Sequence, residues 1–265
     1  MDRVLFENEN HKFVLIGFQE TKGEDDVPTN QYLIIHNDQA ILLDPGGFGL
    51  YTVLLSRVMN YLHDTESLVG IFLSHQDPDV AAGTGTWLKM FTNAKVYMSH
   101  VWHRFIPHYN IDDPSCFVSL PDEGGTIKLG DLELIVVPAY FNHSPGNINL
   151  YDPVSGILFS GDIGAGATGC PHDDIWVKDW DKYSKCITPF HTRYMSSNKT
   201  LKLWVNLVKE LNPSIIAPQH GYLYKDEYVG HLLDYLYELK TGVDIAEEFY
   251  PKSIKRNIFR SDSML

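Results

Sequence analysis

The sequence predicts a mixed α/β fold in one large domain, and three observations support this prediction. Short apolar runs of strand length, such as 69–73 and 215–218, end in loops that contain Gly, Pro, His or Asp. Segments with apolar residues at helical spacing alternate with these runs, as expected when helices cover the faces of a sheet. The 265 residues, 44% of them hydrophobic and 21% charged, are enough to bury a core and have an ordinary globular composition.

The expected elements follow from these patterns in chain order. The first three strands, at 11–18, 31–35 and 40–44, are unequally apolar on their two faces, which indicates a sheet with one covered face. Apolar residues at helical spacing predict a helix over 50–62, and the alternating stretch 126–137 around Gly130-Asp131 predicts a tight hairpin. The remaining expected elements are strands at 69–73, 95–99, 149–151, 157–160 and 215–218 and helices at 81–88, 198–211 and 228–239. We expect residues 1–245 to form the domain and 246–265 a C-terminal tail.

Composition and charge limit the possible functions. The formal net charge is −13, from 21 Lys and Arg against 34 Asp and Glu, and such an acidic surface repels phosphate backbones, so we expect no nucleic-acid partner. No apolar run approaches the roughly 20 residues of a membrane span, and the first residues do not resemble a signal peptide. Cys116, Cys170 and Cys186 lack metal-type spacing. We therefore expect a cytoplasmic protein with no membrane partner and no disulfide framework.

The segment Ser74–Val80 is the strongest candidate for a functional site. It lies between a predicted strand and a predicted helix, so it forms a tight turn. Residues two apart on an extended chain point the same way, so His75, Asp77 and Asp79 can converge on one point. Pro78 restricts the preceding residue to an extended conformation, which helps hold this geometry. One imidazole and two carboxylates indicate a metal site. The alternative is a solvated acidic turn with an Asp at the helix N-cap.

The same pattern occurs at three further strand ends. His143 follows the predicted hairpin beside a Pro-Gly turn, Asp162 directly follows Gly161, and His220 follows the strand at 215–218. A Gly before a carboxylate lets the backbone approach another group closely. Each of these residues alone could be purely structural. Four strand-end loops with this pattern indicate one shared site, because such loops meet at one edge of layered α/β folds.

Several other residues have two interpretations each, and we assign no catalytic residue. Asp44, at a strand end, either supports the site from behind or forms a turn. Tyr140, three residues before His143, is a candidate for a supporting group. The aromatic stretch Trp176–Tyr194 is either a lid that excludes water or ordinary core. His100, His103 and His108, in an aromatic-rich connection that also holds Trp102, are either lid or supporting groups of the site or ordinary polar side chains of an aromatic loop.

Five segments in this order resemble the metallo-β-lactamase superfamily, from about residue 10 to about residue 240. They are Leu43-Asp44-Pro45-Gly46, Ser74-His75-x-Asp77-x-Asp79, His143-Ser144-Pro145-Gly146, Leu158-Phe159-Ser160-Gly161-Asp162 and Ala217-Pro218-Gln219-His220-Gly221. The resemblance implies an αββα sandwich, the metallo-β-lactamase fold, with a binuclear metal site at one edge of its two sheets.

Departures from the superfamily pattern point to iron. Zinc hydrolases of this fold carry H-x-H-x-D-H, whereas Asp77 stands at the second position here and Val80 at the last. A carboxylate in place of an imidazole makes the site harder, which favours iron or manganese over zinc. An acidic residue at this position resembles the flavodiiron proteins, whose motif is H-x-E-x-D-H.

The flavodiiron resemblance also implies how the ligands are shared. It implies one iron held by His75, Asp77 and His143, and a second held by Asp79 and His220. Asp162 is then the bridge between the two ions. Because Val80 replaces a His, the second iron is one ligand short, and we expect an open coordination position there for a small molecule.

The function implied by the resemblance is oxygen binding. Flavodiiron proteins reduce O₂ or NO with electrons from an attached FMN domain, and we expect no such domain in this chain. A free-standing domain of this kind most resembles the oxygen-binding di-iron proteins related to that family. This implies two iron ions that bind O₂ as a diferric-peroxo adduct, in an oxygen sensor of bacterial chemotaxis or related signalling. A homodimer and a signalling partner are implied as well.

Two alternatives from other classes remain open. The first is a reductase of O₂, NO or peroxide that takes electrons from a separate flavoprotein or rubredoxin-like donor. The second is a metal-dependent hydrolase of an ester, lactone or thioester, which needs an activated metal-bound water. Nuclease activity is the weakest option, because the net charge is −13 and the sequence holds no inserted β-CASP-like domain.

Overall fold

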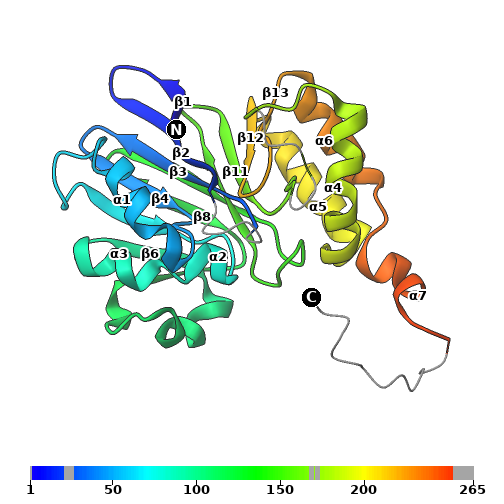
Figure 1. Cartoon of the computed structure of the whole chain (residues 1–265), viewed down its shortest axis with the longest axis horizontal. Helices are drawn as coiled ribbons and strands as arrows, with labels where there is room; N and C mark the ends of the chain where they lie inside the picture. The colour runs from blue at the N-terminus through cyan, green and yellow to red at the C-terminus, as the bar shows by residue number, and fades with distance from the viewer. Residues whose placement is uncertain (1, 21–26, 167–169, 171–173, 253–265) are drawn as a thin grey trace, which may run out of the picture.

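The computed structural model is an αββα sandwich, in which two sheets pack face to face and helices cover their outer faces (Figure 1). It describes residues 2–20, 27–166, 170 and 174–252. Helices of the N-terminal half, blue to cyan in Figure 1, lie on one side of the sheets, and those of the C-terminal part, yellow to orange, lie on the other. The predicted fold class is confirmed.

Among the described residues, the first sheet holds seven strands in sequence order. They are β1 (Arg3–Glu7), β2 (His11–Glu20), β3 (Thr29–His36), β4 (Gln39–Leu43), β5 (Leu68–Phe72), β6 (Lys95–Ser99) and β7 (Phe117–Leu120). The first four are antiparallel, whereas β4 to β7 run parallel to one another. Parallel neighbours need crossover connections. These contain η1 (Phe48–Leu50), α1 (Tyr51–Val58), α2 (Pro78–Ala81), α3 (Thr84–Met90), η2 (His100–Tyr109) and η3 (Pro114–Cys116).

The second sheet, within the described part of the chain, has the strand order β13-β12-β11-β10-β9-β8. Its strands are β8 (Gly125–Leu129), β9 (Leu132–Pro138), β10 (Ile148–Asp152), β11 (Ile157–Gly161), β12 (Ile215–Pro218) and β13 (Tyr224–Lys225). Helices α4 (Trp180–Tyr194), α5 (Asn198–Leu211) and α6 (Glu227–Glu238) cover it, and η4 (Gly242–Ile245) and α7 (Ala246–Phe249) follow. Only β11 and β12 are parallel, and the helices α4 and α5 connect them.

The core between the sheets is aromatic near the edge that carries the candidate ligands. Tyr32 and Phe72 of the first sheet pack against Phe159 of the second, with ring centroids 5.4 and 6.2 Å apart. All three side chains are fully buried. The Tyr32 hydroxyl donates to the Pro218 carbonyl at 2.7 Å. This contact joins the middle of β3 to the end of β12.

Most predicted elements are present, with boundaries shifted by a few residues. The strands at 95–99 and 215–218 and the helix at 198–211 have the predicted bounds. The strand predicted at 40–44 ends at Leu43, because Asp44 adopts φ +45° and leaves the extended conformation. The helix predicted at 50–62 ends at Val58 as α1.

Several elements are not predicted by the sequence patterns, among them β1, β7 and α4. β1 and β7 have five and four residues, too few for a clear periodic signal. Helix α4 contains Pro189, a residue that argues against a helix interior. The predicted tail at 246–265 begins with α7, and residues 253–265 of it lie outside the described residues.

Two expectations from composition can be compared with the structure. The expectation of no disulfide is wrong, because Cys170 and Cys186 are bonded, with Cα atoms 5.5 Å apart, while Cys116 is free. The fold places Cys186 of α4 beside Cys170, and sequence spacing does not reveal such a pairing. Among the helices that the structure describes, none combines the length and apolar character needed to span a bilayer.

A buried polar contact joins the two sheets far from the candidate ligands. His11 Nε2 of β2 donates to Asp152 Oδ2 of β10 at 2.7 Å, and both side chains are buried. Asp152 also accepts hydrogen bonds from the Ser155 hydroxyl and the Val154 N–H. Loss of the carboxylate would leave buried donors unsatisfied.

Asp152→Ala should therefore lower the free energy of unfolding by about 1–3 kcal/mol, the cost of leaving such groups without a partner. Urea unfolding followed by circular dichroism measures this loss. Asp38→Ala is the control, because Asp38 is highly exposed and its nearest cationic partner is the exposed His63, 3.6 Å away. Equal losses in the two variants would contradict the assigned role.

Candidate metal centre

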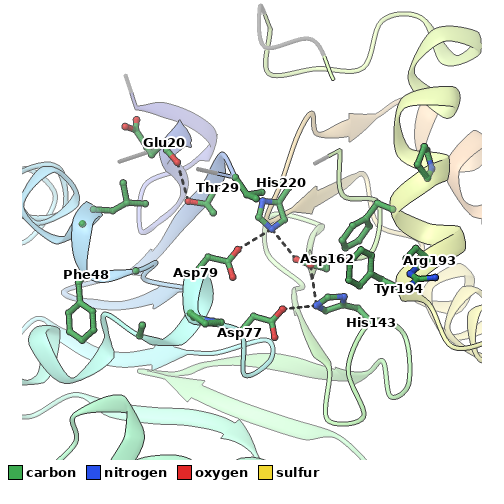
Figure 2. Close-up of a pocket in the computed structure, with 18 of the residues that line it drawn as sticks. Glu20, Thr29, Phe48, Asp77, Asp79, His143, Asp162, Arg193, Tyr194 and His220 are labelled. Carbon is green, nitrogen blue, oxygen red and sulfur yellow. Dashed lines mark hydrogen bonds and ion pairs between the residues drawn. The ribbon is translucent and has the colours of Figure 1, made fainter. Parts of the chain in front are cut away.

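The candidate ligands lie at one edge of the two sheets, in loops that follow four strands (Figure 2). The first three follow β5, where Asp77 is the N-cap of α2 and Asp79 lies in its first turn. The other three follow β9, β11 and β12. The structure thus brings together all six side chains singled out in the sequence: His75, Asp77, Asp79, His143, Asp162 and His220.

One donor group consists of His75, Asp77 and His143. Asp77 Oδ2 lies 3.0 Å from His143 Nε2 and 3.7 Å from His75 Nε2. The two imidazole rings meet edge to face, with centroids 4.8 Å apart. Two ligand atoms that each lie about 2 Å from one metal ion are about 3–4 Å apart. These separations therefore suit a shared ion.

A second donor group, Asp79 and His220, faces the first across Asp162. Asp79 Oδ2 lies 3.3 Å from His220 Nε2. Asp162 Oδ1 lies 3.5 Å from His220 Nε2, while Asp162 Oδ2 lies 3.5 Å from His143 Nε2 and 3.9 Å from His75 Nε2. The two oxygens of one carboxylate thus face two separate donor groups, as a bridging ligand must.

Hydrogen bonds from behind orient two of the imidazoles. Ser74 donates its N–H to Asp44 Oδ1 at 2.8 Å and its hydroxyl proton to Asp44 Oδ2 at 2.5 Å, so its oxygen accepts from His75 Nδ1 at 2.9 Å. His220 Nδ1 donates to the Pro28 carbonyl at 2.6 Å. Both rings thus carry a proton on Nδ1 and turn Nε2 toward the cluster, an arrangement typical of metal-ligating His. Asp44 therefore supports the site as well as forming a turn.

The electrostatics of the cluster favour positive charge between these side chains. Burial lowers the pKa of His75 and His220, but the neighbouring carboxylates, Asp162 first, outweigh it and raise both pKa values to about 9. Burial raises the pKa of Asp77 and Asp79, but hydrogen bonds from the neighbouring imidazoles outweigh it and bring both below the ordinary value. The imidazoles thus hold protons that a metal cation would displace, so metal affinity should rise with pH.

Three buried atoms of the cluster, His75 Nε2, His143 Nδ1 and Asp162 Oδ1, have no hydrogen-bond partner among the described residues. Leaving a buried polar atom without a partner costs about 1–3 kcal/mol. Cations located between the two donor groups would satisfy His75 Nε2 and Asp162 Oδ1, whereas His143 faces the carboxylates with its other nitrogen, Nε2. The residues present, three imidazoles and three carboxylates, therefore fit a binuclear metal site.

The backbone at the cluster takes conformations that bring the loops close together. Gly161, directly before Asp162, has φ +53°, and a Cβ atom there would lie 3.0 Å from the Ser74 side chain. The close approach expected for this glycine is therefore present. His143 has φ +71°, a left-handed conformation that is uncommon for a residue with a side chain and that occurs often at functional sites.

A pocket of about 800 Å³ opens beside the cluster. Its walls come from both halves of the fold: Phe48 lies on one side and Tyr194 and Arg193 lie on the other (Figure 2). Five cluster residues form part of its surface, namely Asp77, Asp79, His143, Asp162 and His220. A small molecule in this pocket therefore has direct access to both donor groups.

Helix α4 contributes one face to the core and one to the pocket. Tyr183, Ile187 and His191 are buried in the core. The Phe190 ring stacks on the His143 ring with centroids 5.5 Å apart, and Tyr194 stacks on Phe190 at 4.9 Å. The α4 residues that line the pocket are Cys186, Pro189, Phe190, Arg193 and Tyr194. One face of α4 is therefore core, as one interpretation of Trp176–Tyr194 expects, and the other lines the pocket. The action of this segment as a lid stays a prediction.

Some sequence candidates make other contacts. Tyr140 donates its hydroxyl to the Pro121 carbonyl at 3.2 Å, so its expected role beside His143 is not supported. The turn after β9 directs this ring toward the segment before β8. Of the histidines in η2, His100 lies 3.5 Å from Asp122 and His103 lies 3.2 Å from the Ser119 hydroxyl. These contacts fit the second interpretation, in which the histidines are ordinary polar side chains of an aromatic loop.

Sequence reasoning did not identify the supporting roles of Ser74, Pro28 and His191. His191 Nε2 accepts from the Gly164 N–H at 2.9 Å, and its Nδ1 donates to the Ile187 carbonyl at 2.8 Å. It thereby anchors the turn that follows Asp162. For Ser74, adjacency to His75 was a signal that could have been used, whereas no sequence spacing connects His191 to Gly164.

Comparison with known proteins assigns the family. Residues 27–221 match the model of the family described as "ODP family beta lactamase". The chain belongs to this family. It is 41% identical to two solved structures of the chemotaxis sensor ODP, one described as a peroxy diiron species and one as the apo state from T. denticola. Each match covers 94% of this chain and 99% of the other, with TM-scores of 0.83 and 0.85.

More distant structures share the fold of the ODP family. The flavodiiron protein from Giardia intestinalis is 16% identical, with a TM-score of 0.73, and the match covers 84% of this chain and 56% of that chain. At this identity the likeness shows the fold alone. The comparison with curated proteins found no match.

Ser74→Ala should weaken metal binding by about 10–100-fold, because the proton on His75 Nδ1 then loses its acceptor and the ring its fixed orientation. Anaerobic calorimetric titration of the metal-free protein with Fe²⁺ measures the affinity. Ser119→Ala, whose hydroxyl contacts His103 at 3.2 Å, is the matched control and should bind like the wild type. An unchanged affinity in Ser74→Ala would show that the hydrogen bonds linking Asp44, Ser74 and His75 do not orient the His75 ring for metal binding.

Acid should destabilise the protein partly through His191, because burial lowers the pKa of this imidazole from 6.5 to about 4. The unfolded chain then binds the proton more readily, so stability falls as the pH drops from about 6.5 to about 4, by up to roughly 3 kcal/mol. His191→Gln keeps a donor and an acceptor but does not titrate. Urea unfolding across this pH range should therefore show a shallower loss in the variant, and parallel curves would contradict the prediction.

Proposed function

We propose that this chain holds two iron ions at the six-residue cluster and binds O₂ there as an oxygen sensor in bacterial signalling. The observation that carries the proposal is the position of Asp162, whose two carboxylate oxygens each lie 3.5 Å from an imidazole nitrogen of a different donor group. The 41% identity to the chemotaxis sensor ODP, one structure of which is described as a peroxy diiron species, supports it.

The proposed ligands divide as the donor groups do. His75, Asp77 and His143 hold the first ion, and Asp79 and His220 hold the second. Asp162 bridges the two. The supporting distances from imidazole nitrogens to carboxylate oxygens are 3.0–3.9 Å, within the range expected for atoms that share an ion.

The donor set favours iron over zinc. Three carboxylates with three imidazoles make a harder environment than the His-rich sites of zinc hydrolases. When bound, two ferrous ions supply electrons to O₂. The part of this chain is to hold the ions, to compensate their charge and to limit the access of water.

The pocket gives the proposed site an open side. Val80, which follows the ligand Asp79, is fully buried in the apolar core and offers no donor. The second ion would therefore have fewer protein ligands than the first, and its proposed ligands Asp79 and His220 line the pocket through which O₂ would enter. Phe190, stacked on His143, covers the first donor group and restricts the access of water to it.

The proposal extends to the setting in which the protein works. We place it in the cytoplasm as a homodimer that passes its oxygen-bound state to a signalling protein. The description of the ODP relatives as chemotaxis sensors supports the signalling role. Size-exclusion chromatography with light scattering tests the dimer.

Iron loading and O₂ exposure test the proposed function. After anaerobic reconstitution, the wild type should hold two Fe²⁺ per chain and develop a long-lived visible absorption band on exposure to O₂. Asp79→Ala should hold about one iron and lose that band, because the second ion then keeps only His220 and one oxygen of Asp162. Metal analysis and time-resolved absorption measure both properties.

Asp122→Ala is the control, since Asp122 is exposed and pairs with His100 at the surface. Two ions and an intact band in Asp79→Ala would refute the assigned ligand. A band that decays with repeated turnover once reductant is added would favour a reductase. Ester or thioester hydrolysis by the zinc-loaded protein would favour a hydrolase.

A further inference from the structure

Two cysteines meet at the wall of the pocket that holds the cluster. Cys186, in α4, lines this pocket together with Asp162 and His143. Its partner Cys170 lies in the chain segment that follows Asp162, eight residues further on, and the two are bonded. The bond therefore joins the segment after the bridging carboxylate to the helix that covers the first donor group.

The position of Cys186 on α4 places it on the wall of the pocket that His143 also lines. Phe190 lies four residues further along, one helical turn away on the same face of α4. That ring stacks on His143 with centroids 5.5 Å apart. A small oxidant that reaches the cluster through the pocket thus passes within reach of Cys186.

The two sulfurs differ in their access to the pocket. Cys170 is buried, with 5% of its surface exposed, and its sulfur packs beside Gly166 near Tyr183. Cys186 is only partly buried and forms part of the pocket surface. An oxidant in the pocket therefore meets Cys186 first, and Cys170 stands behind it as the second thiol.

We propose that Cys170 and Cys186 form a redox-active thiol pair that hydrogen peroxide in the pocket converts to the disulfide. Disulfides of cytoplasmic proteins are usually transient and either catalytic or redox-sensing. The source of the peroxide rests on the function proposed above: when the long-lived oxygen adduct decays, the two electrons that two ferrous ions would have supplied to O₂ would leave, with two protons, as hydrogen peroxide. The thiol pair itself needs only peroxide.

The reaction balances in two steps. The Cys186 thiolate attacks one peroxide oxygen, the O–O bond breaks, and the products are a sulfenic acid and hydroxide, which takes the thiol proton to become water. The Cys170 sulfur then attacks the sulfenic sulfur, the S–S bond forms, and the S–O bond breaks as hydroxide leaves with the second thiol proton. Two thiols lose two electrons, and one hydrogen peroxide becomes two waters.

The disulfide has a structural consequence. It ties α4 to the segment after Asp162, and α4 carries Phe190 and Tyr194 on the pocket wall. Oxidation therefore records past exposure to O₂ as a covalent bond beside the site.

The first arm of the test uses the reduced, metal-free full chain and hydrogen peroxide alone. Free thiols, counted by alkylation and mass spectrometry, should fall from three to one, with a Cys170–Cys186 cross-link in the peptide map. Cys170→Ser should trap a sulfenic acid at Cys186 that reacts with dimedone, and Cys116→Ser, the matched control, should form the cross-link at the wild-type rate. Faster loss of Cys116, or no cross-link, would overturn the proposal. Because the thiol count and the peptide map use the wild-type chain, a folding defect in one of the variants does not affect these two measurements.

The second arm exposes the Fe²⁺-loaded protein to O₂, with and without catalase. The cross-link should form about tenfold or more faster than in metal-free protein under the same O₂. Equal rates in protein that has taken up iron and given the absorption band would overturn the proposed source of peroxide. If the chain binds no iron, the di-iron function fails, while the metal-free arm still decides the thiol pair.

Discussion

Three carboxylates gathered at one edge of two packed sheets are the constraint on which the rest of the structure depends. Asp77, Asp79 and Asp162 would repel one another in a partly buried site, and the three imidazoles at 3.0–3.9 Å offset that repulsion. Two of the atoms without a hydrogen-bond partner, His75 Nε2 and Asp162 Oδ1, lie between the donor groups. The arrangement therefore fits the cations proposed above, and Asp162 turns one oxygen toward each donor group.

The surrounding fold holds this charged cluster through backbone and side-chain contacts from both sheets. Ser74 and Asp44 orient His75, and the Pro28 carbonyl, directly before β3 of the first sheet, orients His220, which follows β12 of the second. The Tyr32 hydroxyl donates to the Pro218 carbonyl and so joins the middle of β3 to the end of β12. These contacts hold the ligand side chains in place from the side of the sheets, so a small molecule reaches them from the pocket. The wall formed by α4 differs, because it carries aromatic rings and the disulfide-bonded sulfur of Cys186.

The sequence predicted the fold and the members of the cluster because both depend on local patterns. Buried strands are apolar runs, and residues such as His75, Asp162 and His220 stand directly after them, where a shared sheet edge collects them. The role of α4 was not predictable in the same way, since Pro189 interrupts its helical pattern and its two faces acquire meaning only from what they touch. Tyr140 was expected beside His143 because of sequence distance, yet the turn after β9 sends its ring to Pro121.

By itself, the sequence determined the identity and order of the six ligand candidates and the carboxylate at position 77 that favours iron, because these are properties of residue type and spacing. The family resemblance already implied how they divide into two donor groups. Only the tertiary structure decided which ring nitrogen faces the cluster and that Cys170 pairs with Cys186 beside the pocket. The physical reason is that such contacts join groups far apart in the sequence, either on opposite sheets or on a helix and a loop. Their distances are set by how the two layers pack, which no local pattern contains.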